Sequence, residues 1–249
     1  MGQPNITEIE AGLKDWDFLA QLPQEMYGFT LLPSSGIKGL VLNLASYVKP
    51  GSRCRLDLTY TTETFDYVPV KTVGLHVFRD ERLFYRDRDK FAQETMAQLP
   101  RLIKAIDRDQ PHAMDWEAQE MGFESWDYWR SLPKKIGDLE LFITPDNPLA
   151  YLNGSYVFLD YTDFQRGNQL YFAYNIYRNE IFAELKHEYF PITTTRFDVG
   201  RGVQDKRKLA VFSELLETHL EKTILDLEKN KKKIWRIHTK IITFVHRKK

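Results

Sequence analysis

The chain has 249 residues, its 35 Lys and Arg are balanced by 35 Asp and Glu, and 14% of its residues are aromatic. Apolar residues make up 43% of the chain and charged residues 28%, which excludes a disordered chain. The length allows one large domain or two of about 100–150 residues each. The single cysteine, Cys54, excludes an intramolecular disulfide and a cysteine-based metal cluster. We expect a cytoplasmic protein, because the first residues lack a signal-peptide pattern and no apolar run approaches the ~18 residues that span a bilayer.

In the first half of the chain, apolar residues at helical spacing predict a helix over residues 7–22. Ser34–Gly36 reads as a turn, and Arg79-Asp80-Glu81 reads as the loop of a hairpin. A second helix is expected from Asp89, and Pro100 should kink or divide it. The extended segments that we expect between these helices are 27–33, 40–48, 53–62, 68–78 and 82–86.

The second half follows the same order of elements. A short helix is expected over 126–132 and a long one from near Asp205, where apolar residues recur at helical spacing. The extended segments that we expect between them are 139–144, 156–162, 169–177, 180–187 and 189–197. In 169–177, Leu170, Phe172, Tyr174 and Ile176 share one face, which is typical of a strand in a sheet.

One short phrase occurs in both halves. Trp16-Asp17 through Leu22-Pro23 returns as Trp126-Asp127 through Leu132-Pro133, and Gly51 precedes Asp89-Lys90 by the same spacing as Gly167 precedes Asp205-Lys206. We interpret this as an internal duplication; chance matching of common α+β patterns is the alternative. The predicted fold is α+β, with two tandem related helix–antiparallel sheet–helix units. Their bounds are 1–109 and 125–228, with a connector at 110–124 and a basic C-terminal extension at 229–249.

The extension carries an unusual charge. Nine of the 35 Lys and Arg residues lie in 229–249, which has no acidic residue, so the rest of the chain has a net charge of about −9. Asymmetry of this kind is typical of an interaction segment. Cations mixed with aromatic residues can neutralise phosphates and stack on bases. The residues that we expect to contact nucleic acid or a partner protein are Lys231, Lys232, Lys233, Trp235, Arg236, Lys240 and Arg247.

Three other interpretations of the extension remain open. It is an ordinary last element that docks on its own fold, a groove-binding segment for a partner protein, or, as a weaker alternative, a peripheral contact to an anionic membrane surface. The sequence pattern does not decide between a helix and a strand, because the apolar residues fit both periods.

Polar residues that are able to do acid–base chemistry gather in the second half. Asp160, Arg178, Glu180 and His187 are the candidates for catalysis, because paired carboxylates beside an arginine and a histidine can move protons or bind phosphate. The alternative is an exposed sheet face with cross-strand ion pairs, since Asp160, Glu180 and Glu184 alternate with apolar residues. No motif predicts a cofactor or a metal ion.

These observations favour a protein without catalytic activity. We expect an intracellular binding protein or an accessory subunit of a larger assembly, in contact with a protein complex or nucleic acid through 229–249. The alternative is an enzyme or small-ligand-binding protein, with a pocket between the second sheet and its long helix. In that case Tyr161, Tyr174, Arg178, Glu180 and His187 would converge on one cavity. A homodimer built through sheet edges is a third possibility.

Overall fold

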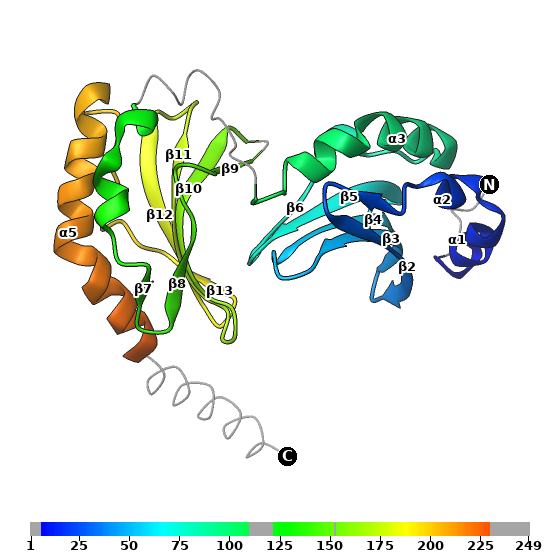
Figure 1. The fold of residues 1–249 in the computed structure, drawn as a ribbon, viewed down its shortest axis with the longest axis horizontal. Helices are drawn as coiled ribbons and strands as arrows, with labels where there is room; N and C mark the ends of the chain where they lie inside the picture. Colours follow the sequence, from blue (N-terminus) through cyan, green and yellow to red (C-terminus); the bar gives the residue numbers. More distant parts are fainter. Residues whose placement is uncertain (1–5, 110–121, 152, 230–249) are drawn as a thin grey trace, which may run out of the picture. The chain divides into compact units, whose positions relative to one another are not determined.

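The computed structural model describes residues 6–109, 122–151 and 153–229 (Figure 1). The chain divides into two compact units, Met1–His112 and Ala113–Lys249, and each is described by itself. Among the described residues, no helix combines the length and the apolar character needed to cross a membrane.

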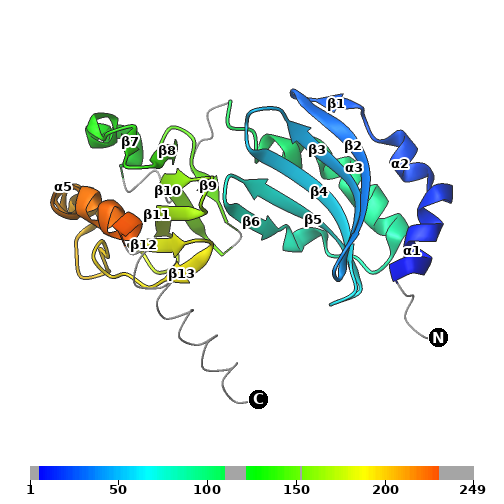
Figure 2. The same ribbon diagram turned by 90° about the horizontal axis from the view of Figure 1, so that it is seen from below.

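The first unit is a six-stranded antiparallel meander with a helix on one face (Figure 2). Its strands pair in chain order: β1 (Glu25–Met26), β2 (Phe29–Lys38), β3 (Val41–Lys49), β4 (Cys54–Thr61), β5 (Asp66–Val73) and β6 (His76–Arg79). The helices and 3-10 turns are α1 (Ile6–Gly12), η1 (Leu13–Asp15), α2 (Asp17–Gln21), η2 (Glu81–Leu83) and α3 (Arg88–Lys104). Helix α3 buries Phe91, Leu99, Leu102 and Ile103, so its apolar stripe faces the sheet.

The second unit has the same plan. Its strands are β7 (Lys135–Ile136), β8 (Leu139–Ile143), β9 (Leu149–Ala150), β10 (Ser155–Asp163), β11 (Asn168–Asn175), β12 (Glu180–His187) and β13 (Phe190–Ile192). They form one antiparallel sheet in the order β13-β12-β11-β10-β8-β7, with β9 also paired to β10. The turns η3 (Phe123–Ser125) and η4 (Asp127–Ser131) precede the sheet, and α5 (Asp205–Lys229) packs along one face (Figure 1).

The predicted α+β class with antiparallel sheets is confirmed, and the two units agree in detail. The Tyr47 hydroxyl donates to the Pro23 carbonyl at 2.8 Å, and the Tyr161 hydroxyl, 114 residues later, donates to the Pro133 carbonyl at 2.7 Å. The register of β3 on β4 shifts between Asn43 and Ala45, and that of β10 on β11 shifts between Val157 and Leu159, again 114 residues later. These matches support the duplication, which we keep as a proposal.

The helix predicted over 7–22 is broken in the structure. Trp16 has extended backbone angles (φ −101°, ψ 96°) between η1 and α2. This conformation lets its indole pack against Tyr67 and Phe91 in the core, at ring-centroid distances of 5.6 and 6.5 Å. Burial of a large aromatic side chain therefore outweighs local helix propensity at this position.

The structure differs from three further predictions for the first unit. The hairpin loop is Gly74-Leu75 rather than 79–81, because Gly74 supplies the positive φ of 61° that a tight two-residue loop needs. Pro100 does not divide helix α3, which continues to Lys104. The proline removes one hydrogen bond, but the buried neighbours Leu99 and Leu102 hold the helix against the sheet. The turn expected at 34–36 is a register shift within β2.

The strand predicted over 189–197 is also shorter than expected. Strand β13 ends at Ile192, and residues 193–198 leave the sheet before Val199 forms a single bridge to Ile181. This departure produces the groove described next.

Candidate functional site

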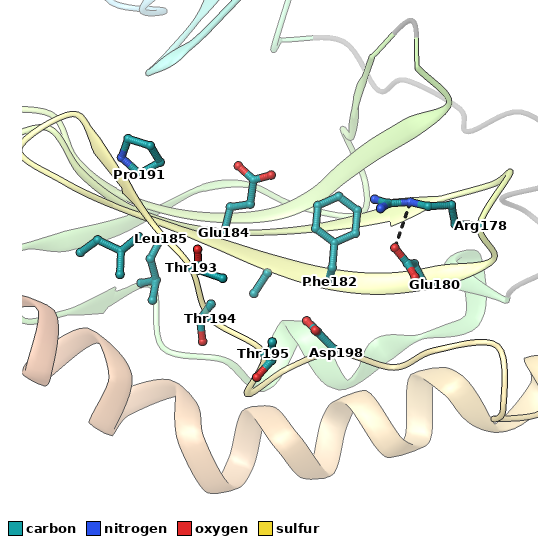
Figure 3. Close-up of a pocket in the computed structure, with 12 residues that line it drawn as sticks. Arg178, Glu180, Phe182, Glu184, Leu185, Pro191, Thr193, Thr194, Thr195 and Asp198 are labelled. Carbon is teal, nitrogen blue, oxygen red and sulfur yellow. Dashed lines mark ion pairs between the residues drawn. The ribbon is translucent and has the colours of Figure 1, made fainter.

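A groove lies along the edge of β12 in the second unit. Strand β13 covers only Leu185–His187 of that edge, and the chain returns to it only at the Ile181–Val199 bridge. Between these two points the segment Thr193–Asp198 stands off from the strand and encloses about 440 Å³ (Figure 3). The lining residues are Arg178, Glu180, Phe182, Ala183, Glu184, Leu185, Pro191, Ile192, Thr193, Thr194, Thr195 and Asp198.

Side chains from two segments line the two sides of the groove. Phe182 and Glu184 of β12 share one face of the strand and point away from α5, as alternation along an extended strand requires (Figure 3). Thr194 and Thr195, from the segment after β13, lie on the α5 side of the strand (Figure 3). A molecule in the groove would therefore meet an aromatic ring and a carboxylate on one side, and hydroxyl groups on the other.

The Asp198 side chain bonds the part of the β12 edge that β13 leaves uncovered. Its carboxylate accepts a hydrogen bond from the backbone of Ala183, which lies in the uncovered part of β12. Burial raises the pKa of Asp198, and the nearby Glu180 carboxylate raises it further. The groove is thus a place where negative charge accumulates.

At one end of the groove, Arg178 pairs with Glu180. Their closest atoms, Nε and Oε1, are 2.9 Å apart, and the Arg178 guanidinium lies 5.2 Å from the centre of the Phe182 ring. The lining contains one guanidinium, that of Arg178, and three carboxylates, those of Glu180, Glu184 and Asp198, so the ionised lining has a net charge of −2. We expect the groove to attract cations more than anions.

The same edge of the first unit is closed. Pro69 stands at the position of β5 that corresponds to Ala183, and proline has no backbone N–H to offer. Its carbonyl accepts a hydrogen bond from the Asp80 N–H at 3.0 Å. The Asp80 carboxylate is 1% exposed and bonds the Lys71 ammonium and the Arg82 guanidinium, each at 2.7 Å. The hollow that remains beside Asp80 and Arg82 is about 110 Å³.

The two cations of this buried cluster stabilise the ionised form of the Asp80 carboxylate. Burial alone would raise the pKa of Asp80, but hydrogen bonds from Arg82 and Lys71 hold it well below its usual range. Three charged groups therefore fill the first unit's edge, where the second unit has open space.

A larger, shallow hollow of about 920 Å³ lies on the face of the first sheet away from α3. Its polar side chains bond one another: the Arg55 Nε atom donates to Asp57 at 2.6 Å, and the Asn43 amide donates to the Ser46 hydroxyl at 2.9 Å. Because these polar groups form hydrogen bonds with one another, we place the candidate site at the β12 edge rather than in this hollow.

The structure brings two of the four catalytic candidates together and separates the others. Arg178 and Glu180 form the ion pair in the groove. Asp160 is 0% exposed and accepts hydrogen bonds from Thr162 and Gln169 at 2.7 and 3.0 Å. His187 is buried at the other end of β12. The expectation of a solvated face at Asp160 was therefore wrong, because this side of β10 is buried.

The two tyrosines of the expected cavity bond elsewhere. The Tyr161 hydroxyl donates to the Pro133 carbonyl, and the Tyr174 hydroxyl lies 3.1 Å from the side-chain oxygen of Asn179. Of the five residues expected to converge, only Arg178 and Glu180 line the groove.

Sequence reasoning missed Thr193, Thr194, Thr195 and Asp198. A run of β-branched threonines favours a strand, which is why 189–197 was predicted as one. The signal against it was the absence of any apolar residue between Ile192 and Phe197, since a half-buried strand alternates. The candidates from Lys231 to Arg247 lie outside the described residues.

Comparisons of the chain with protein-family models, with curated proteins and with solved structures found no match. Within residues 6–109, 122–151 and 153–229, no group of three or more His, Cys, Asp and Glu side chains is placed to hold a metal ion. The groove itself is therefore the basis for a functional proposal.

Proposed function

We propose that the chain is an intracellular, non-catalytic binding protein, an accessory component of a larger assembly, whose second unit receives its ligand in the β12 edge groove. The observation that carries this proposal is the difference between the two edges. Asp80, Lys71 and Arg82 fill the edge of the first unit, whereas the second unit keeps an open groove at the same place.

The contacts of the catalytic candidates favour binding over catalysis. A general base must reach the proton that it abstracts. Asp160 is fully buried and bonded to Thr162 and Gln169, and Glu180 is paired with Arg178. These groups support one another and the fold, and the groove offers recognition through charge, hydroxyl groups and strand edge.

The shape of the groove fits an extended peptide segment. An uncovered strand edge offers backbone groups to an added strand, and side-chain pockets then supply specificity. Leu185 and Ile181 are paired at the two ends of this edge, and an incoming segment would compete with Asp198 for the Ala183 N–H between them. Phe182 provides an aromatic surface, and Glu180 with Asp198 provides the negative charge that suits a lysine or arginine of the ligand.

This proposal is tested by isolating the tagged full-length protein from its native cells, with and without nuclease. Thr194→Arg places a bulky cation in the groove, and Thr30→Arg on the exposed part of β2 is the matched control. We expect a nuclease-resistant protein partner with the wild type and the control, and its loss with Thr194→Arg. Equal recovery with all three would contradict the groove as the binding site.

A second candidate function is nucleic-acid contact through 229–249, favoured by its nine basic residues and interleaved aromatic residues. We expect a salt-dependent gel shift with RNA or DNA that disappears when 229–249 is deleted. Absence of binding at low salt would remove this candidate.

A further inference from the structure

The hollow on the face of the first sheet away from α3 combines cationic and apolar side chains. Its volume is about 920 Å³, and we call it the face hollow. The charged residues that line it are Lys38, Arg55, Asp57 and Arg79, and the apolar ones are Val41, Val70, Val77 and Phe78. The ionised lining therefore has a net charge of +2. These properties suit a ligand that carries a negative charge on an apolar body.

A hydrogen-bond network on this face holds the Arg55 guanidinium in place. Its Nε atom donates to the Asp57 carboxylate at 2.6 Å, and its Nη2 atom donates to the Ser46 hydroxyl at 2.8 Å. The Asn43 amide, 8% exposed, donates to the same two partners at 3.1 and 2.9 Å. Within the part of the chain that the structure describes, nothing bonds Nη1 of Arg55, and the side chain is 40% exposed. This positioned guanidinium therefore keeps N–H donors for a ligand.

Arg79 supplies a second cation to the face hollow. Val70 of β5 lies directly opposite Asp57 of β4 and Arg79 of β6, so Arg79 is in register with the carboxylate that holds Arg55. Strands β4 and β6 are two strand spacings apart, about 10 Å, a gap that two arginine side chains can close around one anionic group. The Arg79 guanidinium approaches Glu63 only at 3.4 Å, and both side chains are exposed. A ligand can therefore compete for this guanidinium at little cost.

A bulge in β2 forms another wall of the face hollow. The register of β2 on β3 shifts between Pro33 and Gly36, and Gly36 supplies a positive φ of 80° there. The Ser35 N–H donates to the side-chain oxygen of Asn43 at 3.0 Å, so the bulge is bonded to the network that holds Arg55. The walls are thus preorganised, which lowers the entropy cost of binding a ligand.

The second unit fills the corresponding place with its own side chains. The counterparts of Arg55, Asp57 and Val70, 114 residues later and in the same register, are Gln169, Tyr171 and Glu184. Gln169 is 0% exposed, and the Tyr171 hydroxyl donates to the Glu184 carboxylate. None of these three is a cation. The first unit therefore keeps space and positive charge on its sheet face, whereas the second keeps space and negative charge at its strand edge.

We propose that the face hollow binds a small organic anion, with its phosphate, sulfate or carboxylate group on Arg55 and Arg79 and its apolar body on Val70, Val77 and Phe78. A nucleic-acid strand fits less well, because bases need aromatic rings to stack on and this lining offers valines and one ring. The site lies in the first unit, so it does not depend on the proposed function of the β12 edge groove.

Fluorescence titration of the purified full chain with anilinonaphthalene sulfonate tests this proposal, because the probe joins an anionic group to apolar rings. Arg79→Gln removes a cation from the lining, and Arg86→Gln, outside the lining and 75% exposed, is the matched control. We expect Arg79→Gln to weaken probe binding about threefold, the change that one exposed charge contact supplies. The control should match the wild type.

A second pair of variants tests the apolar wall. Val77→Asp places a carboxylate at a position that is 64% exposed, and Leu40→Asp, 60% exposed and outside the lining, is its control. We expect Val77→Asp to weaken probe binding more than Arg79→Gln does, because the probe loses an apolar contact and meets a like charge. Leu40→Asp should leave probe binding unchanged.

Equal probe affinities in Arg79→Gln and Arg86→Gln would overturn the proposal, as would a wild type that does not bind the probe. Phenylnaphthylamine has the same rings without the sulfonate, so it should bind the wild type more weakly; equal affinity for both probes would contradict an anion site. Circular dichroism of each variant verifies that it is folded. Thr194→Arg in the β12 edge groove should leave probe binding unchanged, and weaker binding there would place the probe in the groove and refute this site.

Discussion

The two units share one fold but differ at the outer edge of two corresponding strands, β5 in the first unit and β12 in the second. In the first unit Pro69 offers no N–H, and Asp80 fills the edge together with Lys71 and Arg82. In the second unit the Ala183 N–H bonds the Asp198 carboxylate, and the chain stands off to leave a groove of about 440 Å³. The same fold can thus close an edge with buried charge or keep it available for a ligand.

The largest effect is expected at the closed edge. Asp80→Asn leaves the Lys71 ammonium buried without its anionic partner, so we expect the first unit to lose about 3–5 kcal/mol of stability. Urea unfolding followed by hydrogen exchange reports each unit separately. Asp198→Asn at the open edge should change stability by less than ~0.5 kcal/mol. Similar losses in both variants would refute the distinction between the edges.

The closed edge should also respond to acid. The pKa of Asp80 is lower in the folded protein than its ordinary value of 3.8. Its contribution to stability is therefore fully present above pH 4 and is lost as the pH falls through the folded value. Unfolding free energies of the wild type between pH 7 and pH 2 should show this loss in the first unit. Asp80→Asn should lack that part of the pH dependence, and an unchanged slope would argue against the ion pairs.

Ala183→Pro would make the second edge resemble the first. Proline removes the N–H that bonds Asp198, while an edge position tolerates its ring. We expect a cost of about 1–2 kcal/mol, from one lost hydrogen bond to a charged group, measured by denaturant unfolding. Ligand recovery in the cell-isolation assay should fall as well. Retention of both stability and ligand would show that the strand edge is not part of the site.

The smallest effect is expected at the tip of the β12–β13 hairpin, where Glu188 has a positive φ of 50°. Glu188→Asn places a residue that tolerates positive φ in the first loop position, so stability should rise by up to ~1 kcal/mol. Thermal unfolding measures the change. A loss of stability would mean that the Glu188 side chain makes a contact worth more than the backbone strain.

Much of the architecture followed from the sequence because periodicity is local. Strand β12 was predicted with the bounds that it has, Glu180–His187, and α5 begins at Asp205 as its apolar spacing indicated. The break at Trp16 could not be predicted in this way, because it depends on the distant rings of Tyr67 and Phe91. The local sequence pattern predicts which helices and strands form, whereas tertiary contacts determine where they end.

The site was harder to predict than the fold. Arg178 and Glu180 were found because polar and charged residues are dense in this part of the sequence. Asp160 was expected in solvent, because alternation shows which residues share a face but not whether that face is covered. Residues 193–197 were predicted as part of a strand, whereas the chain leaves the sheet there and so forms the groove.

The most direct test of the difference between the two edges is backbone hydrogen exchange of the full chain at Phe182–Leu185 and at Val68–Lys71, the corresponding stretch of the closed edge. We predict several-fold faster exchange at Phe182–Leu185, because the groove leaves this stretch uncovered, whereas Asp80, Lys71 and Arg82 fill the other edge. Equal exchange at the two stretches would contradict the account.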